Sequence, residues 1–335
     1  MTSATRIVAG VVVLAVVAAA PQVLDAHQVH ILIQIMLFAY LSSCWNILGG
    51  FTGQLSFGHA IFLAAGAFTS TLLLLNANVS PWLGMIAGGL VAVMLGLFIG
   101  FLSFRYAIKG PYFVLVTLAF AEIARILVLN TPALGGALGM YIPIQENDFW
   151  QLKLIDKGQY FYVVLAFLVV ALLVSTWIER SAFGHRLLAI RENEDAAQAL
   201  GIDILRYKLL ATALSAFMTA LGGTLYAHYV TFIDAHTLLN INMSVEITIY
   251  SIVGGLGTVW GPLLGAVVLV PMADVIRATY GQTYAGLHLV VYGIVLILVI
   301  RFAPGGFAGL LHLASTTLRR RFGAKRTVAG EEGAL

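Results

Sequence analysis

Polar residues that could do chemistry are sparse in this sequence, and two of them lie inside a long apolar run. Glu122 and Arg125 are three residues apart in the run 111–129, so on a helix they share one face and can neutralise each other. Charged groups within an apolar span are costly and need a partner. An internal ion pair that fixes this helix is therefore the favoured interpretation, and a contact with a solute is the alternative.

A second group of polar residues surrounds a short break between two apolar runs. Gln54, Ser56 and His59 lie in this break, where helix ends can face the charged groups of a solute. Buried polar side chains more commonly hydrogen-bond neighbouring helices, and this is the simpler role for Ser56 and His59. Glu246, near one end of a later run, could face either a solute pathway or a docked protein. These four residues are the candidates for a substrate pathway.

The sequence shows no recognisable catalytic or metal site. No set of His, Asp and Glu residues has metal-ligand spacing, and no nucleophile lies beside a recognisable base. The single Cys44 excludes an intramolecular disulfide and a cysteine zinc cluster. The Gly-x-x-x-x-Gly-Lys-Ser/Thr phosphate cradle is also absent, so ATP must be handled by another subunit if it is used. The sequence therefore predicts neither an enzyme nor a bound cofactor.

Composition determines the class of protein that must position these residues. Of the 335 residues, 60% are hydrophobic and only 10% are charged, and the mean hydropathy is +0.95. Soluble domains carry about 25% charged residues, so the chain is an integral membrane protein. Apolar runs near 20 residues long predict spanning helices, since barrel strands would show alternation over about ten residues. The pI near 9.0 does not imply nucleic acid, because membrane proteins concentrate Lys and Arg in cytoplasmic loops.

The apolar runs predict an all-α bundle of about ten spanning helices. The first run is expected to be a retained helix; a cleaved signal peptide is the alternative, which Pro21 disfavours because it directly follows the small-residue site. Small residues every four positions in 84–100 predict close packing with another helix. Residues 1–310 form the predicted transmembrane domain, and a basic cytoplasmic tail, 311–335, follows. The predicted spans cover about residues 7–24, 30–48, 59–75, 81–104, 111–129, 160–178, 209–228, 244–256, 261–277 and 285–302.

The distribution of positive charge predicts the orientation of the bundle. With ten helices and both termini in the cytoplasm, 14 of the 18 Lys and Arg residues fall in inside segments. This orientation places the polar segment 179–208 in the cytoplasm and the loops 130–159 and 229–243 outside. The Gly-Gly breaks at 49–50 and 254–255 would then lie at the same face. They are either a trace of an internal repeat or an instance of a pair that is common in membrane proteins.

The polar segment 179–208 has a helical pattern of its own, with apolar residues every three or four positions and charges between them. It contains Asp195, Ala196 and Ala197, followed by Gly201. The small alanines would let a partner approach closely, and Gly201 permits a turn between two short helices. The pattern resembles the E-A-A-x-x-x-G loop of ABC-importer permeases, which docks into a soluble ATPase and transmits its closure. The downstream proline of that motif is absent here, and a solvated amphipathic linker is the alternative.

Three further stretches extend this resemblance over about residues 40–305. They are Gly50-Phe-Thr-Gly-Gln-Leu-Ser-Phe-Gly-His-Ala60, Lys109-Gly-Pro-Tyr-Phe113, and Gly254-Gly-Leu-Gly-Thr258 followed by Trp260-Gly-Pro262. Together they resemble branched-chain amino-acid ABC permeases of the LivM type. The resemblance implies a second homologous permease subunit, two cytoplasmic ATP-binding-cassette subunits and a periplasmic amino-acid-binding protein as partners. It also implies a multi-pass location in the lipid of a bacterial inner membrane.

The resemblance thus favours a permease subunit of an ATP-driven importer for branched-chain amino acids. Related permeases serve urea and short amides, and the permease sequence separates these cargoes poorly. A stand-alone secondary transporter is the rival from another class. It should carry uncompensated charges at mid-membrane, whereas Glu122 is offset by Arg125. A membrane enzyme would need a polar catalytic cluster, and none is recognisable.

Overall fold

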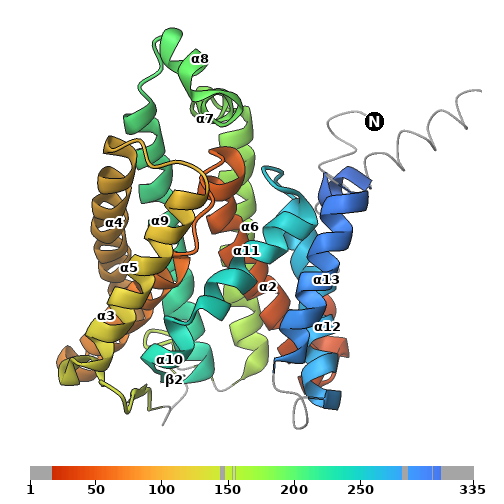
Figure 1. Cartoon of the computed structure of the whole chain (residues 1–335). Helices are drawn as coiled ribbons and strands as arrows, with labels where there is room; N and C mark the ends of the chain where they lie inside the picture. Colours follow the sequence, from red (N-terminus) through yellow and green to blue (C-terminus); the bar gives the residue numbers. More distant parts are fainter. Residues whose placement is uncertain are drawn as a thin grey trace, which may run out of the picture.

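The computed structural model describes residues 17–143, 148–152, 154, 156–280, 286–303 and 305–310, which form a helical bundle (Figure 1). Eight helices in this part of the chain are long and apolar enough to cross a membrane, and α11, with 15 residues, is shorter. All predicted spans after the first are confirmed as helices. The first span falls largely outside the described residues, as does the whole tail 311–335. The long helices are α2 (Ala26–Asn46), α3 (His59–Ala77), α4 (Pro81–Arg105), α5 (Pro111–Leu129), α6 (Lys157–Arg180), α9 (Ile204–Val230), α11 (Ile241–Gly255), α12 (Gly261–Tyr280) and α13 (Leu287–Phe302).

Short elements occupy the two ends of the bundle. Figure 1 shows α7 and α8 at one end and α10 with β2 at the other. The strands pair antiparallel, which joins the loops 130–159 and 229–243. The polar segment 179–208 therefore lies at the end opposite these two loops, as the predicted orientation requires. The short elements are η1 (Ile47–Phe51, a π-helix), η2 (Pro132–Leu134), β1 (Met140–Tyr141), α7 (Ala182–Glu192), α8 (Glu194–Ala199), β2 (Phe232–Ile233) and α10 (Ala235–Leu238).

α2 is the central helix of the bundle. It packs against α6, α9, α11 and α12, and every side chain from Ala39 to Asn46 is buried. The Tyr40 hydroxyl donates to the Met218 carbonyl oxygen of α9 at 2.7 Å, and the Ser42 hydroxyl lies 2.8 Å from that of Ser251 in α11. Because polar side chains inside a helix bundle need partners, these bonds fix the position of α2 between α9 and α11.

α3, α4 and α9 approach one another closely because glycines lie at their contacts. A Cβ placed on Gly223 would lie 2.0 Å from the Leu63 carbonyl oxygen, and one on Gly66 would lie 1.9 Å from that of Ala220. A Cβ on Gly88 of α4 would lie 2.9 Å from the Gly66 Cα. Such small-residue contacts let helix backbones touch. The close packing predicted for the glycine stripe of α4 is therefore confirmed.

Adding a methyl group at one of these contacts should separate the helices. We expect Gly223→Ala to destabilise the bundle by about 1–3 kcal/mol, because the new Cβ meets backbone that cannot rotate away. Gly293→Ala is the control, since no atom lies within 4 Å of a Cβ at Gly293 in α13. It should change stability by less than about 0.5 kcal/mol. Thermal unfolding in detergent measures the stability of both variants. Equal melting temperatures for Gly223→Ala and Gly293→Ala would contradict the packing described.

Candidate functional site

Side-chain caps build the polar segment at the end of α6. The Ser181 hydroxyl accepts from the Gly184 amide at the start of α7, and Asn193 accepts from the Ala196 amide, 3.0 Å away, at the start of α8. Such caps satisfy the free amides at helix starts. Gly201 has φ +82°, a left-handed value suited to glycine, and the chain turns there into α9. The turn predicted at Gly201 is present, but it lies between α8 and α9, and the two short helices are separated at Asn193.

The predicted docking residues divide between two faces of α8. Asp195 and Ala196 are exposed, the Asp195 side chain to 93%, and Gly201 is exposed beside them. Ala197 is buried inside the chain at 2% exposure. The expectation that both alanines admit a partner is therefore corrected: successive residues of an α-helix point about 100° apart, so of the two only Ala196 lies on the free face. We call Asp195, Ala196 and Gly201 the docking face.

Beneath the docking face lies a charged group that we call the Glu194 cluster. It comprises Glu194, Lys208, Lys109 and Gln54. The Glu194 carboxylate lies 2.5 Å from the Lys208 Nζ and 2.9 Å from the Lys109 Nζ, and the Gln54 Nε2 donates to it at 3.4 Å. The Lys208 side chain is only 3% exposed, whereas that of Lys109 is 50% exposed. The cluster joins α8 to the start of α9, to the α4–α5 loop and to the break after α2.

The electrostatics of this cluster favour the charged forms of Glu194 and Lys109, the two ionisable members outside the spanning helices. Burial would raise the pKa of Glu194, but hydrogen bonds from Lys208 and Lys109 outweigh burial and hold that pKa below its usual value. The hydrogen bond with Glu194 raises the pKa of Lys109. Gln54, predicted as a pathway residue, belongs to this cluster. This cluster was not recognisable from the sequence, because Glu194 and Lys208 are 14 residues apart and meet only through the turn at Gly201.

Arg191, in the last turn of α7, reaches the two glycine breaks predicted to share a face. Its Nη1 donates to the Gly50 carbonyl oxygen at 2.7 Å, and a Cβ on Gly257 would lie 2.3 Å from the same nitrogen. Asn46 joins the breaks directly: its Oδ1 accepts from the Gly257 amide and its Nδ2 donates to the Thr258 carbonyl oxygen, both at 2.9 Å. The breaks were predicted only to share a face; the structure also brings them into contact, and Arg191 of α7 lies against both.

Ser56 and His59 have structural partners in the break after α2. The Ser56 carbonyl oxygen accepts from the Trp45 indole at 2.7 Å, and its hydroxyl accepts from the Gly58 amide. His59 is fully buried, and its Nε2 lies 2.9 Å from the Ser215 hydroxyl of α9. These contacts agree with hydrogen bonding and packing, the simpler of the two roles weighed for both residues.

Glu122 and Arg125 form the predicted ion pair. The Arg125 Nε donates to the Glu122 Oε2 at 2.9 Å. The pair does not lie inside the bundle, however: the Glu122 side chain is 51% exposed, because α5 is a peripheral helix with few buried residues. The Arg125 Nη1 also lies 3.5 Å from the His236 Nδ1 of α10. The pair thus lies on a partly exposed face of α5 next to α10, and not in the buried interior of the bundle.

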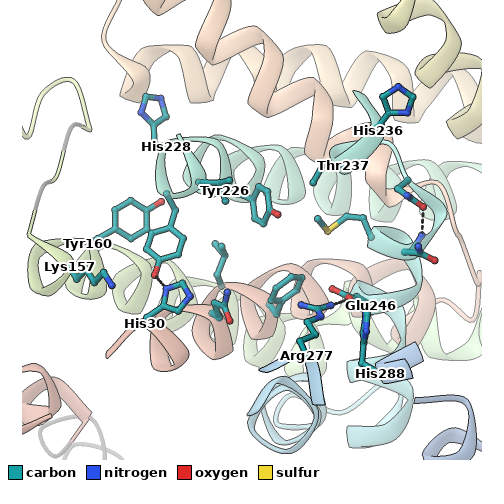
Figure 2. Close-up of a pocket in the computed structure, with 18 of the residues that line it drawn as sticks. His30, Lys157, Tyr160, Tyr226, His228, His236, Thr237, Glu246, Arg277 and His288 are labelled. Carbon is teal, nitrogen blue, oxygen red and sulfur yellow. Dashed lines mark hydrogen bonds and ion pairs between the residues drawn. The ribbon is translucent and has the colours of Figure 1, made fainter. Parts of the chain in front are cut away.

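The fourth pathway candidate, Glu246, lines a cavity at the end of the bundle opposite α7 and α8 (Figure 2). We call it the outer cavity. It has a volume of about 770 Å³, and residues of α2, α6, α9, α10, α11, α12 and α13 line it. Figure 2 shows Lys157, Tyr160 and His30 at one end and Glu246, Arg277 and His288 at the other. The cavity is therefore polar at both ends, unlike the apolar grooves expected between lipid-facing helices.

Glu246 forms an ion pair with Arg277, a cavity-lining residue that was not among the sequence candidates. The Arg277 Nη2 donates to the Glu246 Oε1 at 2.6 Å, and the His288 Nε2 lies 3.7 Å from the same oxygen. Glu246 is 8% exposed, whereas half of the Arg277 side chain is exposed. The sequence indicated this pairing in part. Glu246 lies near the start of one predicted span and Arg277 at the end of the next, so both are expected at the same end of the bundle. Within the described residues, no group of three or more His, Cys, Asp or Glu could hold a metal ion.

Comparison with known proteins gives a consistent result. The family model described as "Branched-chain amino acid transport system / permease component" matches residues 28–300. The chain is 28% identical to the high-affinity branched-chain amino acid transport system permease protein LivM of Escherichia coli K12, over 94% of this chain and 77% of that protein. The corresponding LivM protein of Salmonella typhimurium is also 28% identical, over 92% and 76%.

A relative with a different named cargo is similar as well. The L-arabinose ABC transporter permease protein AraH of Azospirillum brasilense is 26% identical over 72% of this chain and 69% of that protein. No solved structure matches the chain. The similarity is therefore to permease proteins of more than one cargo class.

Removing the carboxylate of Glu194 should destabilise the segment more than removing the half-exposed Lys109. Glu194→Gln leaves the buried Lys208 charge without its partner, so we expect a loss of about 3–5 kcal/mol. Lys109→Ala removes a half-exposed partner and should cost less than about 1 kcal/mol. The double variant Glu194→Gln/Lys208→Met leaves no buried charge and should recover most of the loss. Thermal unfolding of the three variants measures the order, and a Glu194→Gln variant as stable as Lys109→Ala would contradict it.

The same cluster predicts a loss of stability in acid. The pKa of Glu194 is lower in the folded chain, so its contribution is complete above the ordinary carboxyl pKa and is lost as pH falls through the folded value. The difference in melting temperature between wild type and Glu194→Gln should therefore shrink as pH falls below about 4.5. If the difference in melting temperature stays constant as the pH falls through and below this value, the charge of the Glu194 carboxylate is not the source of the stabilisation.

Proposed function

The chain belongs to the family of branched-chain amino acid transport system permease components, and from this premise we propose that it is a permease subunit of an ATP-driven importer for branched-chain amino acids. The proposal includes a bacterial inner-membrane location, a second homologous permease subunit, two ATP-binding-cassette subunits and a periplasmic amino-acid-binding protein. It follows the chain's similarity to LivM proteins over more than nine-tenths of its length. Both termini are proposed to lie in the cytoplasm.

The observation that carries the proposal is the exposed docking face on α8 and the following turn, with charged contacts supporting it from below. Asp195, Ala196 and Gly201 are exposed at the end of the bundle, while the Glu194 cluster and Arg191 bind the same helices to the spans below. A solvated linker would not need a buried lysine beneath it. The arrangement suits a surface that receives a force from a partner and passes it into the membrane domain. ATP hydrolysis is assigned to that partner, since the sequence has no phosphate cradle.

Reconstitution tests the proposed function directly. The chain, with its co-purifying permease and ATP-binding-cassette subunits, is placed in proteoliposomes with the binding protein, and uptake of radiolabelled L-leucine is followed. We expect uptake only with hydrolysable ATP. Leucine transport by the purified chain alone would establish the secondary-transporter rival. Uptake of urea, acetamide or L-arabinose in place of leucine would assign the chain to another cargo within its family.

A charge on the docking face should prevent docking without disturbing the fold. In Ala196→Glu the new carboxylate would be buried against the partner, which costs several kcal/mol, so ATPase binding and leucine uptake should fall at least about tenfold. His185→Glu adds the same charge at an exposed position of α7 and is the control. Co-purification of the ATPase with each variant measures binding. Equal recovery from both variants would remove the docking claim.

Arg191 is proposed to couple α7 to the two glycine breaks. Arg191→Ala removes the bond to Gly50, so the ATPase should still bind and hydrolyse ATP while less leucine moves per ATP. Residues that carry coupling typically change it by about 0.5–2 kcal/mol, so we expect a roughly 2- to 30-fold lower ratio. Arg186→Ala is the matched control, because Arg186 contacts Tyr207 of α9 and not the breaks. An unchanged ratio in Arg191→Ala would refute the coupling role.

A further inference from the structure

The outer cavity holds a charge pair that packing of the bundle does not require. Glu246 and Arg277 come from α11 and α12, which are already packed along their lengths through the close contacts of Gly254 and Gly265. Buried ion pairs are often no more stabilising than apolar residues of similar size. Ionisable residues within membrane helices are correspondingly rare and mark functional sites by default. The pair therefore calls for an explanation beyond stability.

The geometry leaves part of the pair available to a solute. A guanidinium carries five donors, and the structure shows one bond from Arg277 to Glu246, through Nη2. Half of the Arg277 side chain is exposed, and both residues line the cavity. Arginine suits a carboxylate because its planar donors can bind both oxygens. The nearby Glu246 carboxylate, with His288 behind it, offers the complementary place for an ammonium group.

An apolar stretch of the wall between the two polar ends matches the side chain of an aliphatic amino acid. Leu37 and Phe38 of α2 and Met243 of α11 line the same cavity, and its volume of about 770 Å³ lies within the range of about 300–1,000 Å³ typical of small-molecule sites. Figure 2 shows Tyr226 of α9 across the cavity from the pair. A polar end with one cation and one anion, next to this apolar stretch of wall, is complementary to a zwitterion with an apolar side chain.

We propose that the outer cavity is a binding site for a free α-amino acid, with Arg277 on its carboxylate and Glu246 on its ammonium group. The inference rests on the proposed function and deepens it, because it makes the permease subunit itself select a zwitterionic cargo. A neutral sugar or amide would leave the remaining Arg277 donors and Glu246 acceptors without a charged ligand group, and sites built for such groups reject ligands that lack them. The pair thus separates amino acids from the neutral cargoes of similar permeases.

Equilibrium binding to the full chain in nanodiscs tests this site. The probe is tritiated L-leucine, with three competitors: 4-methylvalerate, which lacks the ammonium group, isoamylamine, which lacks the carboxylate, and neutral L-arabinose. We expect leucine to bind roughly 10- to 100-fold more tightly than either single-charge analogue, since each loses one charged contact. L-Arabinose should not compete. Equal competition by L-arabinose would overturn the proposal.

Single variants assign each charge to its group. Arg277→Gln should remove the advantage of leucine over isoamylamine, and Glu246→Gln should remove its advantage over 4-methylvalerate. A purely structural role for the pair would weaken all ligands alike, and that result would also overturn the proposal. Arg301→Gln, at the exposed last turn of α13 and away from the cavity, is the control and should leave leucine binding unchanged.

A double variant guards against misfolding, and uptake separates this proposal from the proposed function. Glu246→Gln/Arg277→Gln removes both charges without leaving one buried alone, so it should fold and yet lose leucine binding. Undiminished binding in this variant would overturn the site. If the wild-type importer takes up leucine while the double variant does so at the same rate, the function stands and the cavity site falls. If the wild-type importer takes up no leucine, the proposed function falls instead.

Discussion

The hydrogen bond from Arg191 to the Gly50 carbonyl oxygen joins α7 to the point where α2 loses its α-helical form. In a membrane, backbone groups released by a broken helix must find partners within the protein. Arg191 supplies one of these partners, and Asn46 supplies two more for the break between α11 and α12. Both breaks are thus stabilised by residues from elsewhere in the chain. The position of the polar segment and the conformation of the breaks depend on each other.

The two charged sites at opposite ends of the bundle differ in how completely their charges are paired. In the Glu194 cluster, the carboxylate is shared by two lysines and an amide, and the buried Lys208 also lies over the Phe104 ring. Such a saturated group holds helices in place and leaves little capacity for a ligand. In the outer cavity, Arg277 has one bond to Glu246 and is half exposed. The first arrangement suits a mechanical support, and the second suits a binding site.

The fold was predictable from the sequence to the extent that apolar length and period determine it. The spans from α2 to α13 and the glycine packing of α4 follow from these patterns, because hydrocarbon imposes the same requirement on every spanning helix. The site was predictable only in part. The direction of Ala197 depends on where α8 begins, and that start is set by the Asn193 cap. The partnerships of Glu194 and Arg277 depend on turns and on helix neighbours, which a periodic pattern does not specify.

α2 and α11 run from the outer cavity to the two glycine breaks, so they link the two ends of the molecule. α2 contributes Leu37 and Phe38 to the outer cavity and continues through η1, which contains Gly49-Gly50, while α11 contributes Glu246 and ends at Gly254-Gly255. The helices are held side by side by the bonds between Ser42 and Ser251. Packed helices move largely as rigid elements, so the proposed action of Arg191 on the breaks would reach the cavity walls through α2 and α11. The same two helices therefore carry both the cavity charge and the contact with the docking segment.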